Sequence, residues 1–589
     1  MNIRNLNQID DSELKTLLTG QKLVSIVGSG ISIWQPTNLP SGVAVGQSLF
    51  RVLFEQIPEL VNHSAGLESL FKQLPFENIM EACPENGVLR KLLKQLYNTK
   101  RYNPIHELLV HLITTKTICA VITTNYDCCL EEAFLDAGSP QVARVITEDD
   151  ALSLAPGQQV YFKIHGTADD IAGESLVFQL AQEGALEPWK SSLLHRITDA
   201  STLLIIGYSG LDFEICPELR KLNVKQIIWN YRSETEITHN AREVIRNKTG
   251  QILIGDMREL LSRIFRPVQA DLGSATSDVE QLFRTTFASD TLDLWRARLL
   301  NLLSYGAASS QIIKKLVTAN PSTAVRRVEI MREHARSLHY GGAYKSSART
   351  YEEAANIAEA GKLAAEEIFG LFLEVSDSWR CYGAFSRARR ALKKAEAFAS
   401  TMNISRPDLI AALKLKQILL LRRKYQLAGL IGIRYLQEYF KQEAEPLFVS
   451  AAEALLLSGQ WFNFQQLRLW ADRFGFPPSI TRPPDHYEAP APRQGYEHLG
   501  FPMAQMMVFR DEIDSKRRAI DDDAESEAVE KADLAEALEL RAEVWKINYL
   551  LIKKFPRQRT FVRLRKFLNN FRRCEYSPTM RALLLLIRP

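Results

Sequence analysis

The sequence predicts an α/β domain with a Rossmann-like parallel sheet at the N-terminus, followed by an all-α region of helical repeats. The first observation is that short apolar, β-rich segments alternate with amphipathic segments up to about residue 268, as in a parallel sheet covered by helices. The second is that the β-rich segments stop after Arg266-Pro267 and helical patterns follow one another. A length of 589 residues also favours several domains over one core.

Six segments have the near-continuous Val, Ile and Leu content of strands that are buried on both faces. They are Lys22–Val27, Thr117–Ile122, Val160–Ile164, Thr202–Ile206, Lys225–Trp229 and Gln251–Ile254. Between them, Gly46–Gln56 and Asn103–Thr114 are predicted helices. In the second helix Asn103 is the expected cap and Pro104 the first helical residue. Residues 1–268 are therefore the predicted α/β domain.

Residues 269–476 carry a weak internal repeat. Gly342-Ala343-Tyr344 and Gly383-Ala384-Phe385 each begin the same spacing of aromatic and small residues, and weaker copies lie around Tyr425 and Trp461. The pattern resembles tetratricopeptide-type units, in which a small residue at the helix crossing lets two helices pack closely. The alternative is a set of generic helical hairpins.

The helical pattern of the sequence ends at Phe476. Residues 477–502 are rich in proline and are predicted to form a long loop, because proline removes a backbone donor and restricts the residue before it. Residues 503–589 are predicted to be helical, with a basic tail from Leu551 in which Glu575 is the single acid. A solvated basic face is the favoured interpretation of this tail, and a nucleic-acid interface is considered for this tail alone.

The composition is that of an ordinary soluble globular protein. With 46% hydrophobic and 24% charged residues it excludes collagen-like, disordered and membrane classes. The first residues mix charged and amide side chains where a secretory peptide would be apolar, so we expect a cytoplasmic protein. The formal charge of +4 is too small for this length to predict a nucleic-acid partner.

Cysteine and histidine spacing predicts no metal. The seven cysteines are an odd number with no repeated C-x-x-C spacing, which is typical of reduced cytosolic thiols without structural zinc or disulfides. Neither His106 with His111 nor His334 with His339 has the i, i+4 spacing of a helical metal pair.

Small and polar residues follow every predicted strand of the α/β domain. In chain order the segments are Gly28-Ser29-Gly30-Ile31-Ser32, Thr124-Asn125-Tyr126-Asp127, His165-Gly166, Gly207-Tyr208-Ser209, Asn230 and Gly255-Asp256. Open parallel sheets bind ligands at the carboxyl ends of their strands. The glycines of the first segment would let phosphates approach backbone N–H groups. That segment lacks the P-loop lysine and the third glycine of the dehydrogenase fingerprint, so neither class is indicated.

Each of these residues also has an ordinary structural interpretation. Asp127 could cap a following helix, Asn125 could serve a turn, and a single histidine such as His165 is more often structural than catalytic. Their joint order is harder to explain in this way, because six strand ends would meet at one crevice.

Taken together, these motifs resemble the NAD-binding domain of the sirtuin superfamily, particularly its bacterial antiviral-defence branch. The resemblance covers about residues 15–268 and does not extend to the helical region. It implies NAD-binding roles for Gly28, Gly30, Ser32, Thr124, Asp127, Gly207, Ser209 and Asn230. Within that set Gly28, Gly30 and Ser32 would hold the pyrophosphate, and Asn230 the adenosine ribose. Asn125 and His165 would be the catalytic residues at the nicotinamide ribose.

The departures from the deacylase pattern shift the expected activity. The two C-x-x-C pairs that bind structural zinc in protein-deacetylating sirtuins are missing, and Thr124-Asn125-Tyr126-Asp127 replaces their Gln-Asn-Ile-Asp arrangement. The resemblance therefore implies hydrolysis of NAD itself. Release of nicotinamide passes through an oxocarbenium-like state and needs no strong general acid, because the leaving group already carries positive charge. His165 can accept a proton near neutral pH, and the Asn125 amide can orient water or a ribose hydroxyl.

The leading hypothesis is a NAD-hydrolysing effector of an anti-phage system, with NAD as substrate, no metal, and a helical region that senses a phage component. The defence branch also implies a homo-oligomer. A second hypothesis is an interaction protein that binds a partner through its repeats and holds a nucleotide only as a regulatory ligand. A third is a zinc-less deacylase.

Overall fold

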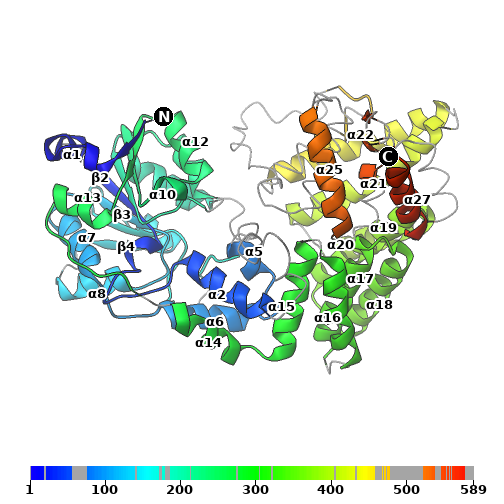
Figure 1. Cartoon of the computed structure of the whole chain (residues 1–589), viewed down its shortest axis with the longest axis horizontal. Helices are drawn as coiled ribbons and strands as arrows, with labels where there is room; N and C mark the ends of the chain where they lie inside the picture. The colour runs from blue at the N-terminus through cyan, green and yellow to red at the C-terminus, as the bar shows by residue number, and fades with distance from the viewer. Residues whose placement is uncertain are drawn as a thin grey trace. The chain divides into compact units, whose positions relative to one another are not determined.

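The computed structural model forms two compact units, one ending at Ala288 and the other beginning at Ser289 (Figure 1). It describes residues 2–18, 22–55, 76–138, 142–170, 175–179, 186–211, 214–273, 276–303, 305–319, 323–402, 406–430, 434–457, 467–468, 470–471, 474–477, 522–537, 546–548, 550–551, 554–555, 558 and 560–576.

The N-terminal unit is built on an eight-stranded sheet with the order β1-β8-β7-β6-β2-β3-β5-β4. Neighbouring strands pair in parallel throughout, which confirms the predicted Rossmann-like sheet. The strands are β1 (Asn2–Asn5), β2 (Leu23–Val27), β3 (Ala120–Thr123), β4 (Ala143–Val145), β5 (Val160–Lys163), β6 (Thr202–Ile206), β7 (Gln226–Tyr231) and β8 (Gly250–Ile254).

All six predicted strands are present, with ends that differ by a few residues. The sequence missed β1 and β4, the two edges of the sheet. Their sequences, Asn-Ile-Arg-Asn and Ala-Arg-Val, are short and include polar residues, as expected for edge strands that keep part of their surface in water. A search for continuous apolar segments cannot find such strands.

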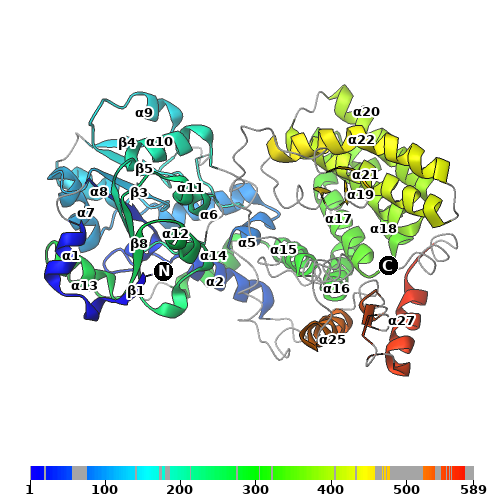
Figure 2. The same cartoon turned by 90° about the horizontal axis from the view of Figure 1, so that it is seen from above.

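Helices cover both faces of the sheet (Figure 2). Alternate strand residues such as Val24 and Ile26 belong to one buried core, and Leu23 and Val27 belong to the other. The Leu23 face is covered by α1 (Asp11–Leu18), α7 (Pro104–Thr114), α8 (Cys129–Asp136) and α13 (Met257–Ile264). The Val24 face is covered by α9 (Glu148–Leu152), α10 (Pro188–Thr198), α11 (Ile215–Lys221) and α12 (His239–Asn247).

Helix α7 begins as its sequence predicts. The Asn103 side chain accepts hydrogen bonds from the N–H groups of Ile105 and His106, and Pro104 is the first helical residue. The same asparagine donates from Nδ2 to the carbonyl of Ile31 at 2.8 Å. The cap thus ties the start of α7 to the turn that follows β2.

A further group of helices completes the N-terminal unit: α2 (Gly42–Phe54), α5 (Phe76–Glu81), α6 (Asn86–Tyr97) and α14 (Thr276–Thr286). Ion pairs Arg51–Glu280 at 3.4 Å and Arg284–Glu55 at 3.2 Å join α14 to the end of α2. The compact unit accordingly continues past residue 268, where we expected the domain to end.

The C-terminal unit consists of helical hairpins, which confirms the predicted repeat architecture. They are α15 (Ser289–Leu302) with α16 (Gly306–Thr318), α17 (Ala324–Tyr340) with α18 (Tyr344–Ala360), α19 (Ala365–Tyr382) with α20 (Phe385–Thr401), and α21 (Pro407–Leu430) with α22 (Arg434–Leu457). Small residues are fully buried at the crossings: Ser309, Ser347 and Ala388. The hydroxyls of Ser309 and Ser347 donate across each hairpin to carbonyls of the first helix, at 3.0 and 2.7 Å.

The repeat anchors were only partly predicted. Tyr344 and Phe385 begin the second helix of their hairpins, so these two copies share one register. Tyr425 lies inside α21, so the copy placed there is out of register, and Trp461 lies outside the described residues. The hairpin that contains Ser309 was missed because Gly306 replaces its aromatic anchor.

Beyond the hairpins the structure describes α25 (Asp522–Ala537) and α27 (Phe561–Arg573), and the expected loop at 477–502 lies almost wholly outside the described residues. Phe567 and Phe571 of α27 pack against Tyr344. The next residues reach the start of α18, where the Glu575 carboxylate accepts hydrogen bonds from the N–H and hydroxyl of Ser346, both at 2.9 Å. In the described part of the chain, no helix has the length and hydropathy to span a membrane.

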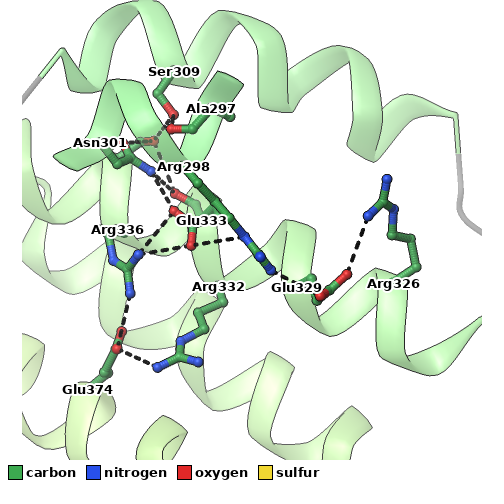
Figure 3. Close-up of polar contacts among 11 residues, drawn as sticks. Ala297, Arg298, Asn301, Ser309, Arg326, Glu329, Arg332, Glu333, Arg336 and Glu374 are labelled. Atoms are coloured by element: carbon green, nitrogen blue, oxygen red, sulfur yellow. Dashed lines mark hydrogen bonds and ion pairs between the residues drawn. The ribbon is translucent and has the colours of Figure 1, made fainter. Parts of the chain in front are cut away.

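A network of half-buried charges around the buried Glu333 connects α15, α17 and α19, the first helices of successive hairpins (Figure 3). Glu333 accepts from Asn301 at 2.8 Å and from Arg336 at 2.9 Å, and lies 3.9 Å from Arg298. Glu374 pairs with Arg336 and with Arg332. Burial would raise the pKa of Glu374, but the two guanidinium groups hold it at about 2. The network therefore stays charged and fixes how neighbouring hairpins stack.

We predict that Glu333→Ala destabilises the helical unit by about 1–3 kcal/mol, because it leaves the buried Asn301 amide and two half-buried guanidinium groups without their partner. Asp408→Ala is the matched control, since its ion pair with Arg406 is solvent-exposed and contributes about 0–1 kcal/mol. Chemical unfolding followed by circular dichroism measures both. Equal shifts in the two variants would contradict the prediction.

Candidate functional site

The predicted site residues gather at the carboxyl ends of four neighbouring strands, in the order β6, β2, β3 and β5. From β2 the chain first adds strands on one side and then returns to add β6 on the other, so the connections reverse between β2 and β6. Open α/β sheets bind ligands outside such a reversal. The segments at this point are Gly28–Ser32 and Gly207–Ser209, with Asn125 and His165 at the neighbouring ends.

The glycines after β2 and β6 pack backbone against backbone. A Cβ on Gly30 would lie 2.6 Å from Gly207 Cα, and one on Gly28 would lie 2.6 Å from the Gly207 carbonyl oxygen. Gly207 has φ +62°, which a side chain would disfavour. The N–H groups of Gly28 and Gly30 donate to the carbonyls of Ile206 and Gly207. We expected the N–H groups of this turn to be free to bind phosphate. In the structure the N–H groups of Gly28 and Gly30 instead form hydrogen bonds to the end of β6 and the turn that follows it.

Ser32 lies at the centre of a buried hydrogen-bond cluster. Its hydroxyl donates to Asp127 Oδ2 at 2.8 Å, accepts from Asn125 Nδ2 at 3.2 Å, and lies 3.3 Å from His106 Nε2. A hydroxyl has one donor and two acceptor positions, so these three contacts use it fully. The cluster joins the ends of β2 and β3 to the start of α7.

His106 belongs to this cluster, although the sequence analysis did not include it among the site residues. The N–H of Asn103 donates to its Nδ1 at 3.2 Å, which assigns the ring proton to Nε2, facing Ser32. Burial lowers the pKa of His106 to about 4, and the Asp127 carboxylate opposes that shift only in part. The signal that could have located it is the capping pattern, since His106 is the third residue after Asn103.

The Asn125 side chain uses its amide nitrogen in a hydrogen bond, whereas its amide oxygen has no partner within the described residues. Its backbone N–H donates to Thr123 Oγ1 at 3.0 Å and its amide nitrogen donates to Ser32. Its Oδ1 is buried and has no hydrogen-bond partner within the described residues. Buried polar atoms are almost always paired, so an orphaned acceptor indicates a place for a ligand hydroxyl or a water.

His165 follows β5 and lies against a carboxylate that the sequence did not reveal. Its Nε2 is 2.9 Å from Glu214 Oε1, and both side chains are more than nine-tenths buried. Glu214 immediately precedes α11, which follows β6 in the chain. Nothing in the spacing between positions 165 and 214 predicts this contact, because it depends on how the two strand ends lie side by side.

The other predicted residues lie around this buried centre. Thr124 is half-buried and Ser209 is exposed. Asp127 Oδ1 accepts from the N–H of Cys129 at 3.2 Å, so it also serves the start of α8. Asn230 differs from expectation: it lies inside β7, not after it, and its Nδ2 donates to the carbonyls of Leu253 and Gly255 at 3.2 and 3.1 Å.

Cysteine and acidic residues also lie together near this edge. The ligand atoms of Cys128, Glu131 and Asp169 are within 4.8 Å of one another. Arg144 pairs with both carboxylates, at 3.2 and 2.5 Å, and Lys163 pairs with Glu131 at 2.9 Å. These cations already neutralise the acids and would repel a metal ion.

Residues 119–225 match the family model described as a SIR2-like domain. This segment of the N-terminal unit is similar to SIR2-like domains. The matched range includes Asn125, His165, Gly207 and Glu214, and it begins after the Gly28–Ser32 turn. No curated protein matches the chain in sequence.

Among solved structures, one similar to this chain is a signal-transduction ATPase with numerous domains (STAND) that has a tetratricopeptide repeat sensor, from Pyrococcus horikoshii. The match has 10% sequence identity and covers 97% of this chain and 90% of the other. Its TM-score is 0.20, so it supports no argument about fold or function here.

We predict that Gly30→Val destabilises the N-terminal unit by about 1–3 kcal/mol, because the new side chain would force the two glycine turns apart. Gly42→Ala is the control, since a Cβ there meets nothing within 4 Å. Thermal unfolding should show a lower Tm for the first variant and no loss for the second. An unchanged Tm in Gly30→Val would disprove the close packing of the two turns.

The pKa of His106 predicts a pH dependence of stability. The unfolded chain takes up a proton at this residue below about pH 6.5, whereas the folded domain does so only below about pH 4. Stability should therefore fall as the pH drops through this range, by about 3 kcal/mol in total from this residue. His106→Gln should lose less stability than the wild type between pH 7 and pH 4.5, as measured by urea unfolding. His111→Gln, on the exposed side of α7, should behave like the wild type.

Proposed function

We propose that this protein hydrolyses NAD+ to nicotinamide and ADP-ribose, as an effector of bacterial anti-phage defence whose activity is controlled by the helical unit. The observation that supports the reaction most directly is the pair of side chains at neighbouring strand ends of a SIR2-like domain. Asn125 offers an unpaired buried acceptor, and His165 offers an imidazole beside a carboxylate.

In this mechanism Asn125 and His165 have different tasks. The Asn125 amide accepts a hydrogen bond at Oδ1 from a ribose hydroxyl or the attacking water, while Ser32 holds its nitrogen. His165 accepts the proton as water adds to the ribose carbon. The bond to nicotinamide breaks with its electron pair neutralising the ring nitrogen, so water and NAD+ yield nicotinamide, ADP-ribose and one proton.

The remaining residues are proposed to hold the nucleotide. Thr124, Gly207 and Ser209 are at least partly accessible at the strand ends, and they suit the ribose and phosphate groups. Ser32 and Asp127 contribute by fixing Asn125. Contacts from Gly28, Gly30 and Asn230 to NAD belong to the same proposal. Because their donors are already engaged, these contacts require small local rearrangements. No metal takes part in this proposal.

The buried centre gives a reason for regulation. Ser32, Asn125, Asp127 and His165 are each less than a tenth exposed, so the substrate needs an opening of the site before it can reach them. We propose that a phage component bound to the helical repeats, in a cytoplasmic homo-oligomer, favours the open arrangement. A trigger must bind that arrangement about 10⁴-fold more tightly to change its population from 1% to 99%. The basic face of α27 is the proposed location for any nucleic-acid contact.

The same burial favours a second candidate function. A protein that held a nucleotide only as a regulatory ligand would have no need for a solvent-accessible base. Its helical repeats would then bind a partner in a nucleotide-dependent way. NAD binding without release of nicotinamide, in the presence of the trigger, distinguishes this candidate from the hydrolase.

We predict that Asn125→Ala lowers NAD turnover by at least about 100-fold, because it removes the acceptor that orients water or the ribose hydroxyl. Purified full-length protein, incubated with NAD and the trigger, is assayed for nicotinamide by chromatography. Asn223→Ala is the control, since the Asn223 amide is exposed and bonds only to Asp199 among the contacts described. Wild-type turnover in Asn125→Ala would remove this residue from the reaction.

A further inference from the structure

Glu214 is a carboxylate in an unusual position. It is the residue immediately before α11 and is 5% exposed. Residues at that position often use their side chain to cap the helix, yet Glu214 makes no such bond. The three buried residues that follow, Ile215, Cys216 and Leu219, anchor the helix in the core of the domain. The backbone of Glu214 is therefore fixed, and its carboxylate is available for another contact.

That contact is with His165. The Glu214 Oε1 to His165 Nε2 distance is 2.9 Å, with side chains only 4% and 8% exposed, which is an ion-pair contact whose angles are not those of a hydrogen bond. On the histidine side, the His165 carbonyl accepts from the Val177 N–H at 3.0 Å. The next residue, Gly166, has φ +82° and no room for a Cβ, which would lie 1.9 Å from the Ser175 carbonyl oxygen. The backbones of Glu214 and His165 are thus each fixed by other contacts, independently of the contact between their two side chains.

We infer that Glu214 is a positioning residue for His165 in the proposed hydrolysis. A carboxylate beside one ring nitrogen keeps the proton on that nitrogen and leaves the other as the proton acceptor. With Nε2 facing Glu214, Nδ1 is the nitrogen that accepts the proton from water. Glu214 touches neither substrate nor water in this role and acts through the imidazole. The inference rests on the proposed function, because it assigns a task to Glu214 only if His165 is the base.

The helix itself supplies a matched control. Glu218, one turn further along α11, lies 3.3 Å from Nε2 of His195, whose side chain is 39% exposed. It also accepts from Ser191 at 2.9 Å and from Lys221 at 2.7 Å. This is another carboxylate–imidazole pair, between α11 and α10, away from the strand ends that form the site. Loss of Glu218 removes a similar contact without affecting His165.

The test compares Glu214→Gln, Glu214→Asp and Glu218→Gln in the full-length protein with its trigger. Glu214→Gln should lower kcat by about 100-fold or more, with the Kd for NAD changed by less than about threefold. Glu214→Asp retains a carboxylate and should recover at least about tenfold of that loss, whereas Glu218→Gln should keep wild-type kcat. In a His165→Gln background, Glu214→Gln should cause no further decrease, because the two residues act as one unit.

A readout that does not depend on turnover is the protonation pattern of His165, observed by ¹⁵N nuclear magnetic resonance of histidine-labelled protein. The wild type should show one tautomer with the proton on Nε2, and Glu214→Gln should show a mixture. Wild-type kcat in Glu214→Gln, or an unchanged tautomer, would overturn the inference alone. Absence of NAD turnover in the triggered wild type would overturn the proposed function, and the positioning role with it.

Discussion

The contact on which the candidate site depends is the backbone packing of Gly28 and Gly30 against Gly207. Two turns that follow different strands approach more closely than any pair of side-chain-bearing residues could. This contact fixes the reversal point of the sheet, and it places Ser32 one residue beyond the turn. The glycines that suggested a phosphate loop are thus explained first by a requirement of the fold, and any role in nucleotide binding comes in addition.

The Ser32 hydroxyl joins several elements of the site through its hydrogen bonds. It connects the ends of β2 and β3, and His106 and Asn103 extend the connection to the start of α7. Asn125 is therefore oriented by groups from three parts of the chain. His165 obtains the same rigidity from a different source, the backbone around Gly166 and the carboxylate of Glu214. The site combines the hydrogen-bond cluster around Ser32 on one side with a carboxylate–imidazole pair on the other.

The sequence predicted those features of the structure that depend on residues close together in the chain. Strands buried on both faces, the Asn103 cap and the small residues at the helix crossings can all be read from neighbouring positions. The edge strands were missed because they are short and polar. Glu214 and His106 were missed because their roles depend on packing between distant elements. Asn230 was placed after its strand because apolar content marks where a strand is buried, whereas its hydrogen-bond ladder with β8 continues to Tyr231.

The contact between Glu575 and Ser346 sets an order of events during synthesis. The carboxylate that completes the start of α18 is separated from it by 229 positions in the chain. Domains fold from the N-terminus as the ribosome releases them, so the N-terminal unit and most of the repeats emerge while this helix end still lacks its partner. This helix start is therefore completed only after residue 575 has been synthesised, and a chain truncated before Glu575 would carry its N-terminal unit together with an unfinished repeat stack.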